Sequence, residues 1–196
     1  ETSTCFLDHI SSKPKKRKST MSVRVNFDDG VEAALNAHIS KELQVGFNYS
    51  AMASYFGRPD VNLPGMTRWS QDSIKMELSH AQKLTDYLLQ RGGRPYLGDV
   101  SKPAKTEFGS ALEAVEFSVE MEKQTYAAIE QLVKLAESVH DNQTAEFLTD
   151  NLLKETLDDL VDCGNVAAGF RRCGQGAGEQ QYDKQLLEKR TGCLIM

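Results

Sequence analysis

Four long apolar stripes in this sequence are each interrupted by an acidic side chain. Apolar residues recur at spacings of three and four in every stripe, which is the pattern of an amphipathic helix. The interrupting acids are Glu42, Glu77, Glu122 and Asp159, and His80 follows Glu77 by one turn. A carboxylate inside a helical bundle is costly to desolvate unless it is paired, whereas several carboxylates and an imidazole can share a metal ion. The pattern therefore predicts a helical bundle built around a metal site.

The composition favours one soluble, all-α domain. The 196 residues are 40% hydrophobic and only 8% aromatic, which suits helix packing better than a β-sandwich or barrel. No apolar run approaches the roughly 20 residues that a membrane span needs. The net charge of -5 disfavours nucleic acid as a partner. The four cysteines lack metal or disulfide spacing, so we expect free thiols and a cytoplasmic protein.

The two ends carry features that a bundle does not need. Residues 1–25 are polar and basic without periodicity, and we expect a disordered tail. Its basic run at residues 15–18 matches a nucleic-acid or nuclear-import patch, but such runs are more often solvated, and a true start at Met21 would remove it. Residues 193–196 form a short C-terminal tail that fits a farnesylation motif. Because four residues make a weak pattern, we expect Cys193 to be unmodified.

Five helices are expected within a single domain that covers residues 26–192. They cover about residues 31–56, 66–90, 110–139 and 142–173, with a shorter fifth helix at 179–189. Residues 92–109 are rich in Pro and Gly and too poor in apolar residues to form a core of their own. Short loops imply antiparallel neighbours, so we predict a four-helix bundle of the order up, down, long crossover, down, up.

The acids match the pattern of a dinuclear carboxylate site in a four-helix bundle. Such a site takes one Glu from each of two helices and a Glu-x-x-His from each of the other two. Glu42 and Glu122 fill the first two places, and Glu77 with His80 fills the third. One Glu-x-x-His alone is weak evidence, because the spacing is common in amphipathic helices. The conjunction of three interrupted stripes is what favours a metal.

Three further side chains are expected near this site. On the fourth helix, Thr156 and Asp159 occupy the place of the second Glu-x-x-His, so Asp159 is a candidate ligand or an acceptor beside the ligands. Tyr49 lies two turns from Glu42, either as a packed phenol hydrogen-bonded to a carboxylate or as a phenol that takes part in redox steps. His38 lies on the same stripe, and we interpret it as a satisfied core or interface histidine.

The amino-acid sequence around these residues is similar to that of a known family. The segments 36–56 (NAHISKELQVGFNYSAMASYF) and 77–93 (ELSHAQKLTDYLLQRGG), with the pair Glu122 and Lys123, resemble ferritins of the eukaryotic heavy-chain type. The resemblance covers about residues 23–192 and implies a ferritin-like bundle. It also implies a 24-subunit cage, homo- or hetero-oligomeric with other ferritin chains, that oxidises ferrous iron with dioxygen and stores a ferric mineral.

The resemblance also implies roles for individual residues. Glu42, Glu77 and His80 are expected to hold one iron, and Glu77 with Glu122 the second, giving two irons per subunit. Tyr49 is expected beside them. Catalytically silent light chains lack the glutamate and histidine ligands, whereas this chain keeps them. The expected activity is therefore that of a ferroxidase, with dioxygen as co-substrate.

Some positions depart from the heavy-chain pattern. Thr156 stands where heavy chains usually have Gln, and neutral residues replace the inner-surface acids that help mineral nucleation, namely Met76, Ser79 and Gln82. These losses favour an alternative in which the chain is a structural or accessory subunit that mineralises weakly and co-assembles with another ferritin chain. The intact glutamate and histidine ligands favour the ferroxidase.

The expected three-fold channel is also altered. Its matching positions are Glu146 and Thr149, so one of two acidic rings is lost, although Asp150 is adjacent. Val133 replaces a histidine near that route. The segment 181–192 aligns only loosely with the family, and we therefore assign no residues to a four-fold pore.

Overall fold

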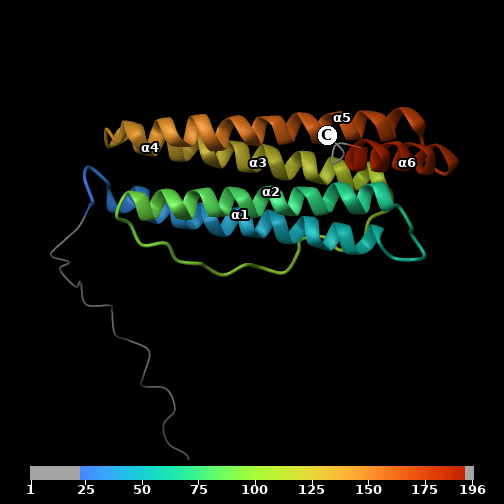
Figure 1. Ribbon diagram of the computed structural model, residues 1–196, viewed down its shortest axis with the longest axis horizontal. Coiled ribbons are helices and arrows are strands. Elements are labelled where there is room, and N and C mark those ends of the chain that lie inside the picture. Colours follow the sequence, from blue (N-terminus) through green and yellow to red (C-terminus); the bar gives the residue numbers. More distant parts are fainter. Residues whose placement is uncertain (1–22, 193–196) are drawn as a thin grey trace, which may run out of the picture.

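The computed structural model describes residues 23–192, and every regular element within that range is a helix (Figure 1). The elements are α1 (Asp29–Phe56), α2 (Pro64–Gln90), α3 (Ala111–Ser138), α4 (Asn142–Phe147), the π-helical segment η1 (Leu148–Leu153), α5 (Lys154–Cys173) and α6 (Ala177–Gly192). The all-α prediction is confirmed. No helix in the described range is long and apolar enough to cross a bilayer. The basic run at 15–18, the start at Met21 and the motif at Cys193 lie outside the described residues.

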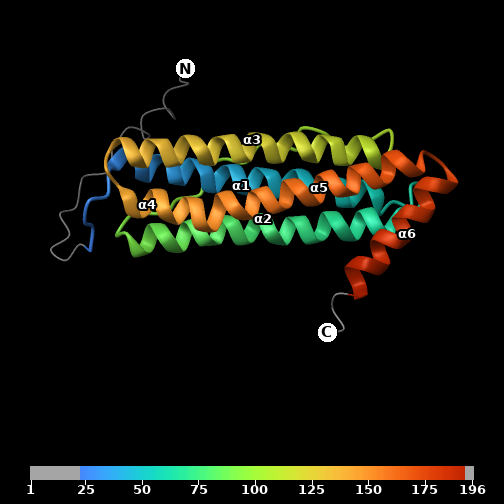
Figure 2. The ribbon, with the colours of Figure 1, turned by 90° about the horizontal axis from the view of Figure 1, so that it is seen from above.

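Two antiparallel helix pairs form the bundle in the predicted order. Helix α1 packs against α2, and α3 packs against α5, while residues 91–110 run back along the bundle to join the pairs (Figures 1 and 2). The predicted fourth helix has the expected extent, but η1 interrupts it. A π turn takes more residues per turn than an α turn, so η1 changes the angular relation between α4 and α5.

The long crossover is tied to one polar stripe of α1. Side chains at every fourth position of α1 accept hydrogen bonds from backbone N–H groups of the crossover. The donor and acceptor pairs are Arg94 and Glu32 (2.7 Å), Tyr96 and Asn36 (2.7 Å), Gly98 and Ser40 (3.1 Å), Ser101 and Gln44 (2.7 Å), and Ala104 and Asn48 (3.1 Å). A segment without a core of its own is thus ordered by the helix beside it.

The short C-terminal helix caps a distant helix. Asp183 of α6 accepts hydrogen bonds from the backbone N–H groups of Gly65 (2.9 Å) and Met66 (2.7 Å), at the first turn of α2. These N–H groups have no partner within α2, and Pro64 precedes them at the first helical position. Helix α6 therefore runs obliquely across the end of α2 (Figure 2).

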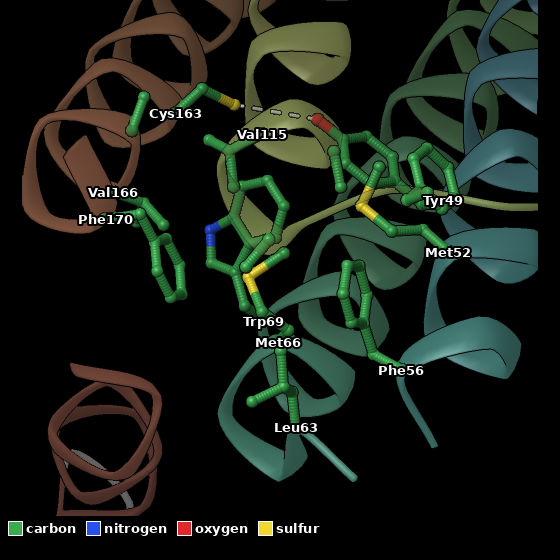
Figure 3. Close-up of a cluster of buried hydrophobic side chains, with 14 of the residues drawn as sticks. Tyr49, Met52, Phe56, Leu63, Met66, Trp69, Val115, Cys163, Val166 and Phe170 are labelled. Atoms are coloured by element: carbon green, nitrogen blue, oxygen red, sulfur yellow. Dashed lines mark hydrogen bonds between the residues drawn. The ribbon is translucent and has the colours of Figure 1, made fainter. Parts of the chain in front are cut away.

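The apolar core is divided into two clusters along the bundle. One cluster contains Phe27, Val31, Leu35, Ile39, Leu84, Leu88, Ile129, Leu132, Leu148 and Leu152 among its members. The other contains Tyr49, Met52, Phe56, Met66, Trp69, Val115, Cys163, Val166 and Phe170 among its members (Figure 3). In α1 the first cluster reaches Ile39 and the second begins at Val45, so Glu42 lies between them. The predicted acids therefore occupy a polar layer in the middle of the bundle.

Removal of one crossover anchor should destabilise the fold. Asn36→Ala deletes the acceptor of Tyr96 and the two hydrogen bonds that the Asn36 amide donates to the Glu32 and Arg94 carbonyls. We expect the free energy of unfolding to fall by about 2 kcal/mol in guanidinium denaturation. Asn165→Ala, at an exposed position of α5, is the matched control and should have little effect. Equal unfolding midpoints for the two variants would contradict the anchoring role.

Candidate metal centre

Three helices bring the main candidate residues together in the polar layer. Glu42 comes from α1, Glu77 and His80 from α2, and Glu122 from α3, and each is at most 2% exposed. One ligand atom from each of Glu42, Glu77 and His80 lies within 4.8 Å of the others. The spacing of three between Glu77 and His80 puts both side chains on one face of α2, where they face α1. This arrangement can hold a cation through two carboxylates and one imidazole.

Burial and repulsion between neighbouring acids disfavour the ionised form of most carboxyl groups in the layer. Burial, with the charges of Glu122 and Glu42, raises the pKa of Glu77 well above its usual value. Burial raises the pKa of Glu122 to about 7 and, with nearby acids on α5, that of Asp159 to about 7. Burial alone would raise the pKa of Glu42, but His38 and other polar neighbours hold that pKa below its usual value. A bound cation would offset the repulsion between these carboxylates and favour their ionised form.

Several buried polar atoms, most of them on acids of the layer, have no hydrogen-bond partner. They are both carboxylate oxygens of Glu42, Oε2 of Glu77, Oδ2 of Asp159, Nε2 of His38 and the Thr125 hydroxyl. Buried polar atoms almost always have a hydrogen-bond partner, so a group of them without partners needs an explanation. Carboxylate oxygens and imidazole nitrogens suit iron and other first-row metals. The residues present therefore fit a metal-binding role.

Tyr49 connects the acid layer to the neighbouring core cluster. Its hydroxyl donates to Oε1 of Glu122 at 2.7 Å. The same hydroxyl lies 3.7 Å from Sγ of Cys163 (Figure 3). Its ring meets Trp69 edge to face, with centroids 5.8 Å apart. Burial raises the pKa of Tyr49 well above its usual value, so the phenol keeps its proton. The hydrogen-bonded phenol expected from the sequence is present, and this bond orients the Glu122 carboxylate.

The two candidates on α5 differ in their surroundings. Thr156 is buried, and its hydroxyl donates to the Leu152 carbonyl one turn earlier at 2.9 Å. That bond uses the hydroxyl proton within the helix. Asp159 instead points toward the layer, since its Oδ2 lies 3.9 Å from Nε2 of His80. Asp159 is therefore the better placed of the two to meet a cation.

Glu155 was missed by the sequence analysis, although it approaches His80 more closely than Asp159 does. Its Oε2 lies 3.2 Å from Nε2 of His80, and its Oε1 accepts a hydrogen bond from Lys83 at 2.6 Å. Glu155 precedes Asp159 by four residues and so shares its face of α5. That spacing was the available signal. The Lys83 ammonium partly neutralises Glu155.

The remaining candidates lie away from the layer. The channel candidates Glu146, Thr149 and Asp150 are exposed on α4 and η1. Three exposed positions of α2 carry the neutral residues Met76, Ser79 and Gln82. The structure therefore groups the predicted ligands but leaves these two sets on the surface of the subunit.

The acid layer should make the metal-free protein less stable as pH rises. Glu122 loses its proton near pH 4.5 when unfolded but near pH 7 when folded, so the folded state binds the extra proton between these values. Its stabilising contribution is complete below about pH 4.5 and is lost as pH rises through about 7. Glu122→Gln should therefore flatten the fall in melting temperature between pH 5.5 and 8.5. Glu137→Gln, at an exposed position of α3, should keep the original slope. Parallel profiles for all three proteins would refute this assignment.

Comparison with known proteins agrees with this geometry. The family model described as a ferritin-like domain matches residues 32–172. The chain is 36% identical to the soma ferritin of Lymnaea stagnalis over 173 residues, which are 88% of this chain and 99% of that protein. It is 36% identical to a ferritin heavy chain of Echinococcus granulosus, covering 85% of this chain and 96% of the relative. A middle-subunit ferritin of Aquarana catesbeiana is 33% identical, covering 86% and 98%. With most of its length matched in this way, the chain belongs to the ferritin family.

Proposed function

We propose that this chain is a heavy-chain type ferritin subunit that oxidises ferrous iron with dioxygen and stores the ferric product. Ferritins bind and store iron in cages of several subunits, and this chain shares that family role. The observation that carries the finer proposal is the grouping of Glu42, Glu77 and His80 within 4.8 Å in a buried layer. We further propose a cage of 24 subunits, alone or with other ferritin chains, in the cytoplasm.

In the proposed reaction, two ferrous ions are the substrates. Glu42, Glu77 and His80 bind one ion, and Glu77 with Glu122 binds the other, so Glu77 is shared. Each ion gives one electron, and dioxygen takes up two electrons and two protons. Tyr49 holds the Glu122 carboxylate in place through its 2.7 Å hydrogen bond. Binding of the ions displaces the protons that the raised pKa values of Glu77 and Glu122 retain.

Residues beyond the central ligands are assigned supporting roles. Asp159 contributes to the second iron, and Thr156 leaves space beside it because its hydroxyl is bonded within α5. Glu146 and Asp150 attract ferrous ions at a three-fold channel of the cage, where Thr149 contributes no charge. The exposed positions of all three channel residues support this role.

A second function is favoured by one specific observation. Met76, Ser79 and Gln82 present no carboxylates on the exposed face of α2. An accessory subunit that contributes mainly shell would lack such nucleating acids. Mineral growth by a cage of this chain alone separates the two functions: sustained growth supports the storage oxidase, and growth only after co-assembly with another ferritin chain supports the accessory role.

Loss of the shared ligand and the imidazole should abolish rapid oxidation. Glu77→Lys combined with His80→Gly removes the bridging carboxylate and the nitrogen donor, and we expect at least a tenfold slower oxidation in stopped-flow measurements. Gln71→Lys combined with Ser79→Gly, at exposed positions of α2, is the matched control. Both proteins should assemble. An unchanged rate in the first variant would disprove the site.

Asp159 should matter more to the second iron than to the first. Asp159→Ala removes a carboxylate whose Oδ2 has no hydrogen-bond partner and whose charge helps to raise the pKa of Glu122, a ligand of the proposed second iron, so anaerobic titration should show weaker binding of the second ferrous ion. Asp158→Ala changes the exposed neighbour and should leave both affinities as they are. If the two variants bind iron identically, Asp159 is only a polar residue of the bundle.

A further inference from the structure

One ring nitrogen of His38, which we interpret from the sequence as a satisfied core or interface histidine, has no hydrogen-bond partner within the described subunit. It lies one turn before Glu42 on α1, and its side chain is 3% exposed. Its Nε2 is 2.7 Å from Oε1 of Glu42, yet neither atom has a partner in hydrogen-bond geometry. The carboxylate oxygen is therefore close to the ring nitrogen but away from the direction in which an N–H would point.

That arrangement resembles two neighbouring ligands of one ion. A metal ion binds imidazole at about 2.1 Å along the direction of the nitrogen lone pair, and adjacent ligands of one ion are about 3 Å apart. An oxygen that sits close to Nε2 and off this direction is placed to be the neighbouring ligand. The observed Nε2–Oε1 distance of 2.7 Å is close to the spacing of two such ligands.

The Glu42 carboxylate lies between two imidazoles. Its Oε1 faces His38 on α1, and its Oε2 lies 4.0 Å from Nδ1 of His80 on α2. The oxygen toward His80 belongs to the proposed iron site. The oxygen toward His38 is a separate ligand atom on the other side of the same carboxylate.

A groove between α1 and α3 lies on the side of His38. It has a volume of about 340 Å³, and its lining includes His38 together with the small residues Ala34, Ala37 and Ala128. Lys41 also lines the groove, with its ammonium donating to the Gln124 carbonyl at 3.0 Å. The positive charge of Lys41 would weaken, but not prevent, the binding of a cation nearby.

We propose that His38 and Glu42 form an additional binding site for a divalent cation, next to the proposed iron site and reached from the groove between α1 and α3. Glu42 is shared by the two sites. An ion therefore passes from one to the other by exchanging His38 for Glu77 and His80 while it stays bound to Glu42. The passage of ferrous iron by this route rests on the proposed function, whereas the binding itself does not. Because Lys41 is close and only two protein ligands are present, this site should be weaker than its neighbour.

Crystals of the assembled protein soaked in Zn²⁺ test the site directly. We expect two separate anomalous peaks, one at Glu77 and His80 and one within bonding distance of His38 Nε2 and Glu42 Oε1. His38→Gln should lose the second peak and keep the first. A peak at Glu77 and His80 alone, in the unmodified protein, overturns the additional site. Absence of both peaks would reject the proposed iron site as well.

Calorimetric titration with Zn²⁺ gives an independent count in solution. His38→Gln should bind one ion fewer per subunit in the weaker phase, with the tighter phase unchanged. Glutamine keeps a hydrogen-bond donor, so a histidine that only positions Glu42 would leave the count the same and refute the proposal. His140→Asn is the control, because it removes an exposed imidazole at a position whose φ of 58° asparagine tolerates. Its count should equal that of the unmodified protein.

Discussion

The cost of burying carboxylates organises this molecule. Glu42, Glu77 and Glu122 sit in the middle of a bundle, where charged groups without partners are strongly disfavoured. The apolar core is therefore split, and cohesion comes from the two hydrophobic clusters on either side of the layer. Tyr49 belongs to one cluster by packing and to the layer by its hydrogen bond. Burial also keeps Cys163 protonated by raising its pKa, so no thiolate competes for a cation there.

Much of the fold follows from the spacing of apolar residues. The helix pairs and the long crossover were predictable because Gly and Pro mark the breaks between clear helical stripes. Glu42, Glu77 and Glu122 were predictable as a group because each interrupts a stripe at mid-helix, and parallel or antiparallel packing brings mid-helix positions to one level. These features need only local periodicity and the connection lengths.

Other features depend on relations that periodicity does not encode. The segment η1 has no breaker residue, since its sequence LTDNLL continues the apolar stripe. Spacing puts Glu155 on the same face of α5 as Asp159, but its 3.2 Å approach to Nε2 of His80 depends on how α5 packs against α2. Asp183 caps α2 from more than one hundred residues away. The unpartnered Nε2 of His38 beside Oε1 of Glu42 depends on side-chain angles, which residue spacing does not give.

The spacing of donors along the extended crossover matches the spacing of acceptors along α1. Four residues of α1 advance about 6 Å along the helix axis, and two extended residues advance about 6.6 Å. The spacing of donors at residues 94, 96 and 98 against acceptors at 32, 36 and 40 follows this near match. Farther along, three residues per step, from 98 to 101 and 104, show a less extended path. Each N–H donor of the crossover therefore has its own acceptor on α1. Deletion of a single residue near the start of the crossover would shift every later donor away from its acceptor.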